Sequence, residues 1–305
     1  MKSYFTTLRL RTLIIGVLIL VMPVKSYAQN EILIVLSDKS NIYNELYVKL
    51  NTKSSTINNF RISYADDITE ELLNNHKLII VAGTKSATIV NNYKFNTPLL
   101  YSLVPKDFYN QSINNHSCPG SACYGIYIEQ PIARYMQLTK VLFGNKVTIT
   151  IPISRSSHYK YQQIKSIAQN VGLKAKKITV SKNTNIPRLL SSTLKEGHVL
   201  LALPDPDIYN KNTARSILLS TYHSNIPLIG YSQAFAKAGA IASLYSSIDD
   251  IASQTVFFAN RILSDNKPQQ KGYYPDNFSL EINKAVARSL NINIISPETI
   301  KRRIK

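Results

Sequence analysis

Tryptophan is absent from this sequence of 305 residues, and cysteine occurs only twice. The missing tryptophan removes the side chain that stacks most strongly on cationic ligands. Acidic residues are also scarce, since 18 Asp and Glu stand against 36 Lys and Arg, for a formal net charge of +18. The basic residues are spread along the chain, with one cluster at residues 301–305 that we interpret as the solvated end of a helix. We therefore expect no nucleic-acid partner.

The sequence also lacks the motifs of several enzyme classes. It contains no G-x-S-x-G, no G-x-G-x-x-G and no phosphate loop, and its five histidines form no H-x-x-x-H pair. Asp205 and Asp207 could act as a carboxylate pair in acid–base catalysis, but Pro204 and Pro206 beside them equally suit a plain turn. We expect a binding protein and not an enzyme, with no catalytic residue, no metal and no cofactor.

The two cysteines, Cys118 and Cys123, have four residues between them in a Pro-Gly loop. In an oxidising compartment such a spacing predicts a local disulfide that shapes the loop. His116 extends the pattern to H-x-C-x-x-x-x-C and allows a metal site instead, but no further ligands at matching positions are evident. We predict the disulfide between Cys118 and Cys123.

The first 28 residues have the features of a secretory signal peptide. Lys2, Arg9 and Arg11 form a basic start, Thr12 to Val24 is mostly apolar, and Ser26-Tyr27-Ala28 offers a cleavage site. The apolar run is shorter than the roughly 20 residues that span a bilayer, although a retained anchor is the alternative. Four of the basic residues lie here, so the remaining chain carries +14. We expect a cleaved leader and, without a lipidated cysteine, a Gram-negative periplasm.

Short apolar runs alternate with stretches of helical periodicity along the rest of the chain. In the first half we predict strands at 31–36, 60–64, 77–82, 97–103 and 124–129, with helices at 41–50 and 69–74 and one opened by Gly83-Thr84. In the second half we predict strands at 147–153, 175–180, 199–203 and 226–230, and helices at 131–143, 161–171 and 185–194. Such β-α alternation on both sides of Glu129–Pro131 predicts two doubly wound lobes with parallel sheets.

Polar and aromatic residues follow several of these strands directly. In open α/β sheets, ligands bind beyond the carboxyl ends of the strands, so these positions are candidate ligand contacts. Arg155, or the backbone N–H groups of Gly83 and Thr84, could hold a carboxylate, and Asp205 an ammonium. The remaining candidates are three tyrosines that could stack on the ligand and four hydrogen-bonding residues, namely Tyr101, Tyr209, Tyr231, Ser37, Ser102, Ser156 and Gln233. Tyrosine is abundant here, so each ring is equally compatible with a packing role.

Four segments carry a family resemblance: LPDPDIYN at 203–210, IPLIGYSQAFAKAGA at 226–240, SIDDIASQTVFFANRIL at 247–263 and FSLEINKAVARSLNI at 278–292. Together they resemble the periplasmic substrate-binding proteins of uncharacterised ABC-type importers, a family that includes proteins similar to aromatic amino acid binders. The likeness is dense from Ile128 to Ile294. The sequence departs from it after Ile153, where Ser154-Arg155-Ser156 replaces a Tyr-Asn-Pro-like turn, and in the inserted cysteine loop.

The resemblance implies a type I periplasmic-binding fold in which the chain crosses between the lobes three times. An N-terminal lobe would comprise 29–129 plus 248–266, and a C-terminal lobe 130–247 plus 270–305, with the third crossing at 267–270. Ser247 and Asp250 are placed to cap the helix after the second crossing. Two lobes hinged in this way are expected to close on a ligand.

We therefore predict an exported, monomeric solute-binding protein that captures a small, possibly amino-acid-like molecule for the membrane permease of an ABC importer. The alternative is the same fold acting as a ligand sensor or as an accessory protein of a receptor or outer-membrane transporter. A hydrolase using Asp205 and Asp207, and a purely structural cell-envelope protein, are the remaining alternatives.

Overall fold

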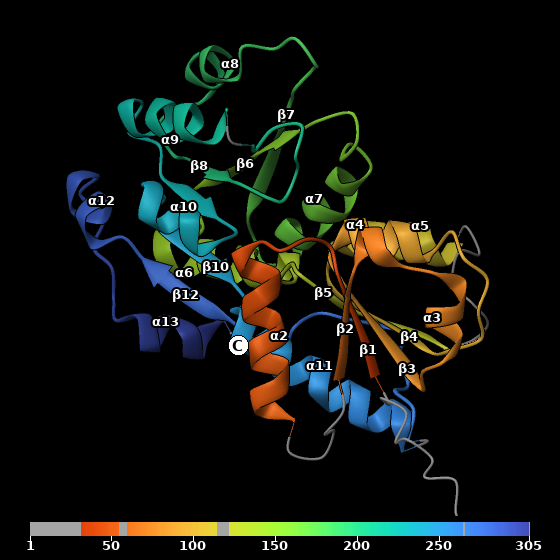
Figure 1. Cartoon of the computed structure of the whole chain (residues 1–305). Coiled ribbons are helices and arrows are strands. Elements are labelled where there is room, and N and C mark those ends of the chain that lie inside the picture. The colour runs from red at the N-terminus through yellow and green to blue at the C-terminus, as the bar shows by residue number, and fades with distance from the viewer. Residues whose placement is uncertain (1–31, 55–59, 115–121, 211, 265, 305) are drawn as a thin grey trace, which may run out of the picture.

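Two parallel-stranded sheets, each covered by helices on both faces, form the two lobes of the protein (Figure 1). The computed structural model describes residues 32–54, 60–114, 122–210, 212–264 and 266–304. The two-lobed α/β prediction is confirmed. Within the described ranges, no helix is both long and apolar enough to cross a bilayer.

The sheet of lobe 1 has the order β11-β5-β4-β3-β1-β2, and all its neighbouring strands are parallel. Its strands are β1 (Ile32–Leu36), β2 (Phe60–Tyr64), β3 (Leu78–Ala82), β4 (Leu99–Val104), β5 (Cys123–Tyr127) and β11 (Gly272–Tyr273). Every residue of β1 and β3 is buried, as the continuous apolar runs predict for strands covered on both faces.

Helices α2 (Asn41–Lys53) and α11 (Ile248–Leu263) pack side by side on one face of this sheet, where Leu46, Leu50 and Ile251 meet Ile32 and Ile34. Helices α3 (Glu70–Asn74), α4 (Thr84–Val90) and α5 (Lys106–Asn114), with a short 3₁₀ turn at Ala65–Asp67, lie by the other face. The predicted cap of α11 is confirmed, since Ser247 and Asp250 form a reciprocal capping box.

The sheet of lobe 2 has the order β12-β10-β9-β8-β6-β7. Its strands are β6 (Thr148–Ile153), β7 (Lys174–Thr179), β8 (His198–Leu201), β9 (Leu228–Gly230), β10 (Ala242–Tyr245) and β12 (Ser279–Ile282). The pairs are parallel except for β12, which runs antiparallel to β10 at one edge. At the other edge, β7 exposes Lys174 and Lys176.

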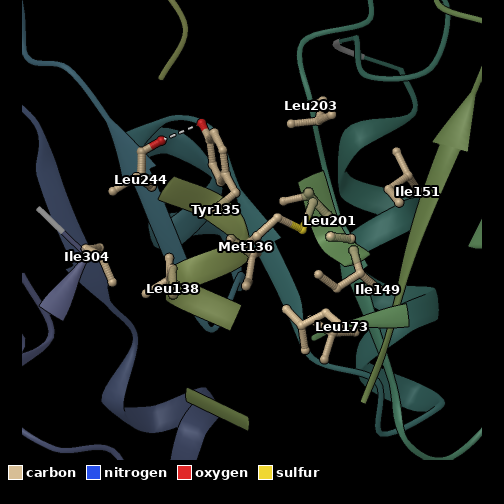
Figure 2. Close-up of a cluster of buried hydrophobic side chains, with 14 of the residues drawn as sticks. Tyr135, Met136, Leu138, Ile149, Ile151, Leu173, Leu201, Leu203, Leu244 and Ile304 are labelled. Atoms are coloured by element: carbon tan, nitrogen blue, oxygen red, sulfur yellow. Dashed lines mark hydrogen bonds between the residues drawn. The ribbon is translucent and has the colours of Figure 1, made fainter. Parts of the chain in front are cut away.

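Two groups of helices cover lobe 2. Helices α6 (Ile132–Phe143), α7 (Lys160–Asn170), α12 (Lys284–Ser289) and α13 (Pro297–Arg303) enclose an aliphatic core on one face. In this core the buried Tyr135 donates a hydrogen bond of 2.8 Å to the carbonyl oxygen of Leu244, beside Met136 and Leu201 (Figure 2). Helices α8 (Ile186–Thr193), α9 (Ala214–His223) and α10 (Gln233–Ala238) pack on the other face.

Three chain segments cross between the lobes: residues 128–131, 246–247 and 274–278. The third was expected at 267–270, but that position is wrong because Gly272 and Tyr273 still pair with Gly125 and Ile126 in lobe 1. The buried Gln130 joins all three crossings, since its amide donates to Ser246 Oγ and, at 3.3 Å, to the carbonyl oxygen of Asn277. The Gln130 side chain therefore links the three crossing segments through hydrogen bonds.

Candidate functional site

In lobe 1, the polar groups at the carboxyl ends of β1 and β3 form hydrogen bonds with neighbouring groups of the protein. Ser37 Oγ donates to the carbonyl oxygen of Ala82 at 2.8 Å and accepts from the backbone N–H of Ser86 at 3.1 Å. The N–H of Gly83 donates to the carbonyl oxygen of Ser102 at 2.9 Å. A β-carbon at Gly83, where φ is +91°, would lie 2.3 Å from the Tyr43 hydroxyl of α2. The predicted anion site at this turn is therefore not available at Gly83, and only Thr84 remains exposed.

Two further predicted contacts of lobe 1 lie in its core. Tyr101 is fully buried, and its hydroxyl donates to Asn91 Oδ1 at 2.6 Å. Ser102 is equally buried and shares a 3.0 Å hydrogen bond with Thr255 of α11. In this conformation neither side chain can reach a ligand, because both are buried and hydrogen-bonded within lobe 1. The strand also does not end at Leu103 as predicted.

Instead, β4 continues to Val104 through an irregularity at Leu103, which has a φ of +55°. Such a left-handed backbone is uncommon for a residue other than glycine. Helix α5 then starts at Lys106, close to the first crossing. Both carboxylate oxygens of Glu129 accept the backbone N–H of Lys106, at 3.2 and 3.0 Å. The polar end of this strand is therefore built from Lys106 and Glu129.

In lobe 2, the loops after β6 and β8 are fastened to each other by serine–aspartate hydrogen bonds. Ser157 Oγ donates to Asp205 Oδ2 at 2.6 Å, and Ser156 Oγ donates to Asp207 Oδ2 at 2.8 Å. Asp205 is 5% exposed and also accepts the backbone N–H of Asp207 at 3.0 Å. The turn alternative for Asp205 is thus what the structure shows, and its carboxylate is occupied within the protein.

The remaining predicted residues of lobe 2 do not form one cluster. Arg155 is exposed and lines an outer cleft of about 870 Å³ with His158 and Lys182. Tyr231 is half-buried and packs on Tyr209 and Phe235, whereas Gln233 is exposed at the start of α10. The Tyr209 ring is buried, and its hydroxyl has no hydrogen-bond partner among the residues that the structure describes. Most of the predicted residues therefore contact other protein groups, whereas Arg155 and Gln233 are exposed.

A cavity of about 230 Å³ lies between the lobes beside the hinge, and we call it the hinge-side cavity. Lobe 1 and the crossing segments contribute mainly polar side chains, namely Lys106, Asp107, Asn110, Glu129, Gln130 and Tyr274. Lobe 2 contributes a mixed wall of Ile132, Tyr135, Tyr159, Lys160, Gln163, Ile164, Leu203 and Pro204. The cavity is where the ends of β4 and β5 face those of β6 and β8, which is the position expected for a ligand in such sheets.

The charged groups of the hinge-side cavity fall into two sets. Asp107 and Lys160 form an ion pair across the lobes. Lys106 instead donates to the Tyr274 hydroxyl at 3.1 Å, with its ammonium 4.9 Å from the centre of that ring. Burial raises the pKa of Glu129, while the backbone N–H of Lys106 and then the charge of Lys160 act in the opposite direction. Besides this ion pair, the cavity therefore holds the cation of Lys106 and the partly buried carboxyl group of Glu129.

Four tyrosines connect this cavity to the core of lobe 1. Tyr101, Tyr109, Tyr127 and Tyr274 meet edge to face in sequence, with ring centres 5.5, 5.7 and 5.1 Å apart. A β-carbon at Gly125 would lie 2.5 Å from the Tyr109 ring, so the array requires glycine there. The tyrosines give Lys106 a fixed aromatic surface on which to lie.

Sequence reasoning missed every residue that lines this cavity. The available signals were Pro105, which suits the first turn of a helix, and the charged Lys106-Asp107 pair just after a buried strand. The predicted disulfide and its metal alternative involve His116 and Cys118, which lie outside the described residues. In the described part of the chain, no three His, Cys, Asp or Glu side chains are placed to bind a metal ion together.

Several solved structures share this fold. An L-Trp complex of an ABC domain from Streptococcus pneumonia is 17% identical, with a TM-score of 0.62, covering 89% of this chain and 98% of the other. A conserved domain protein from Vibrio cholerae gives 17% identity, a TM-score of 0.62 and coverages of 90% and 98%. A ligand-free, open substrate binding protein with adhesive properties from Clostridium difficile gives 16% identity and a TM-score of 0.70. That match covers 88% of this chain and 96% of the other. At these identities the likeness establishes the fold alone.

No curated protein matches the sequence. The sequence pattern of the ABC transporter substrate binding proteins, however, matches residues 40–303. That match includes both sheets apart from β1, all three crossings and every residue that lines the hinge-side cavity. The chain belongs to the family of ABC transporter substrate binding proteins.

Proposed function

We propose that this protein is an exported solute-binding protein that holds an amino-acid-like molecule in the hinge-side cavity and delivers it to an ABC importer. The observation that carries the proposal is a cavity with walls from both lobes and from the hinge, because only such a site couples ligand binding to lobe closure. The family is one of binding proteins and not of enzymes, and it supports small-molecule capture.

The charges of the cavity favour a zwitterion. Lys106 could hold a ligand carboxylate, and Glu129 could accept hydrogen bonds from a ligand ammonium group. Ile132, Ile164 and Leu203 offer an apolar surface for the ligand's side chain. The L-Trp complex of the Streptococcus pneumonia protein also supports an amino acid ligand.

The size of the cavity favours a compact ligand. Its 230 Å³ is smaller than the roughly 300–1,000 Å³ of pockets for drug-sized molecules. In liquid water that volume holds about seven or eight molecules, at about 30 Å³ each. A single amino acid or a similar metabolite therefore suits it better than a peptide.

The first 28 residues support export through a signal peptide, and the family supports a permease as the partner. In this proposal the leader is cleaved and the mature protein works in a Gram-negative periplasm. The Arg155 side chain of the outer cleft and the Tyr231 ring would contact the ligand at most from outside the hinge-side cavity, so we expect Arg155→Ala and Tyr231→Ala to weaken binding less than changes at Lys106.

A thermal-shift screen of mature protein with the common L-amino acids, nucleobases and small organic anions tests the proposal. A compound present at 100 times its dissociation constant adds roughly 2.7 kcal/mol to the free energy of unfolding, which is an easily measured rise in melting temperature. We expect an amino acid to give that rise in the wild type and a much smaller one in Lys106→Met and Glu129→Gln. Lys146→Met, an exposed lysine before β6, is the matched control and should bind as the wild type does.

Two results would contradict the proposal. One is a screen in which no L-amino acid raises the melting temperature. The other is a compound that binds equally well to the wild type, to Lys106→Met and to Glu129→Gln while losing affinity in Arg155→Ala, since this would move the site to the outer cleft.

A further inference from the structure

One ion pair joins the two lobes directly at the rim of the hinge-side cavity. Asp107, the second residue of α5 in lobe 1, pairs with Lys160, the first residue of α7 in lobe 2. Their side chains are only 26% and 24% exposed. Figure 1 shows α7 of lobe 2 just above the end of lobe 1 that carries α4 and α5, where the lobes meet. The pair is therefore partly shielded from water. Solvent and salt weaken the attraction between its charges less than they would at an open surface.

Other ion pairs of the described residues have a different placement. Lys49 and Lys53 pair with Asp249 between α2 and α11, and Lys85 pairs with Asp66. All of these residues belong to lobe 1, so their pairing is the same whether the lobes are open or closed. Asp66 is also 72% exposed, and such exposed pairs contribute little free energy.

The lobe 2 half of the interlobe pair is held rigidly. Lys160 and its neighbour Tyr159 follow the turn at 154–157, where Ser157 is bound to Asp205 and Ser156 to Asp207. The lobe 1 half is equally fixed, because Glu129 binds the backbone N–H of Lys106 at the start of α5. With both halves fixed, the distance between the two charges depends on the angle between the lobes.

Tyr159, the residue before Lys160, lines the cavity beside this ion pair. The residue is 56% exposed, and its pKa is raised first by the partial burial of its hydroxyl and then by the nearby Asp107. Asp107, Tyr159 and Lys160 thus all line the cavity at the boundary between the lobes. Moving α7 away from α5 would break the ion pair and open that wall.

We propose that Asp107 is a positioning residue for ligand capture: its ion pair with Lys160 forms an interlobe latch that sets the equilibrium between open and closed lobes. The latch acts on the ligand through the cavity wall and not by contact, and its link to capture rests on the function proposed above. Breaking it shifts the protein toward the open form, and restoring the charge pair in the opposite sense restores the closed form.

Small-angle X-ray scattering of the mature protein without added compounds tests the latch. The single charge reversals Asp107→Lys and Lys160→Asp place like charges opposite each other, and each should raise the radius of gyration. We expect the ratio of closed to open molecules to fall by about fivefold or more, the lower end of usual coupling between sites. The double variant Asp107→Lys with Lys160→Asp should return to the wild-type radius, which a merely structural role of either residue would not produce.

Asp66→Lys is the matched control, because it reverses a charge of an ion pair within lobe 1 and should leave the radius of gyration unchanged. Circular dichroism confirms that each variant is folded, and if a reversal unfolds, Asp107→Asn should show a smaller shift in the same direction. Folded single variants with the wild-type radius, or a double variant as open as the singles, would overturn the latch. This measurement needs no ligand, so its failure leaves ligand capture intact, and a failed ligand screen leaves the latch intact.

Discussion

The two lobes present the same edge of the same kind of sheet to each other, yet they close their strand ends with different chemistry. At the ends of β1 and β3, lobe 1 uses neutral groups, since Ser37 binds backbone atoms and the Tyr43 hydroxyl fills the space beside Gly83. Lobe 2 uses charge, since Asp205 and Asp207 each accept a serine hydroxyl from the neighbouring loop. A polar residue at a strand end is therefore a ligand contact only if the protein itself leaves its hydrogen bonds unused.

The largest expected loss of stability comes from changing Gly125, the glycine that packs against the tyrosines of lobe 1. We expect Gly125→Ala to cost about 3 kcal/mol of unfolding free energy, because its β-carbon would lie 2.5 Å from the rigid Tyr109 ring. Gly197→Ala is the control, as nothing lies within 4 Å of its β-carbon and only a φ of +80° opposes it, at about 1 kcal/mol. Urea unfolding measures both, and equal losses would mean that the ring moves aside freely.

The strand-end chemistry itself can be compared by removing one closing group from each lobe. Asp205→Ala should cost about 2 kcal/mol, because a buried carboxylate accepts both the Ser157 hydroxyl and the N–H of Asp207. Ser37→Ala should cost about 1 kcal/mol, since the bonds that it loses are between neutral groups. Chemical denaturation gives both values, and a larger loss for Ser37→Ala would reverse the comparison.

Within lobe 2, two buried tyrosines should respond in opposite directions to loss of the hydroxyl. Tyr135→Phe should cost about 1 kcal/mol, because its hydroxyl donates to the carbonyl oxygen of Leu244. Tyr209→Phe should leave stability unchanged or raise it by up to about 1 kcal/mol, since its buried hydroxyl has no partner to lose. Melting temperatures of the two variants test this expectation. A lower melting temperature of Tyr209→Phe than of the wild type would show that the hydroxyl is hydrogen-bonded to an ordered water.

The smallest expected effect is a pH-dependent change in stability at Glu129, which lies at the boundary between the lobes. This effect disappears at acidic pH. Burial raises the pKa of Glu129 above its ordinary 4.5, so its folded form binds a proton more tightly than the unfolded chain does. The stability linked to that proton is complete below pH 4.5 and is lost as the pH rises through the folded pKa. Glu129→Gln should therefore match the wild type in acid and become relatively more stable toward neutral pH. Parallel curves of unfolding free energy against pH would contradict this expectation.

Much of this fold follows from the sequence because parallel strands buried on both faces must be apolar throughout. Residues 32–36 and 78–82 are such runs, and each lies within a predicted strand. Helix α5 was not predicted, because KDFYNQSIN contains few apolar residues and depends on packing by Tyr109. The antiparallel β12 and the two-residue β11 depend on long-range pairing that no local pattern encodes.

The candidate site could be predicted only as a region. The strand-end rule identifies the correct edge, but the bulge at Leu103 displaces the polar residues from Ser102 to Lys106, and a positive φ at leucine has no sequence signal. In lobe 2 the same rule selects Arg155 and Ser156, whereas Tyr159 and Lys160 a few residues later line the cavity. Which hydroxyls remain free for a ligand depends on partners far away in sequence, such as Thr255 for Ser102.

The lysines of β7 have a consequence for how copies of this protein behave in a crowded compartment. An outer strand with unpaired backbone groups is a template on which a second molecule can add its own strand. Lys174 and Lys176 project from that border of lobe 2, so an incoming β7 from another copy would bring like charges face to face. Part of the large positive charge of this chain thus guards against fibre-like self-association.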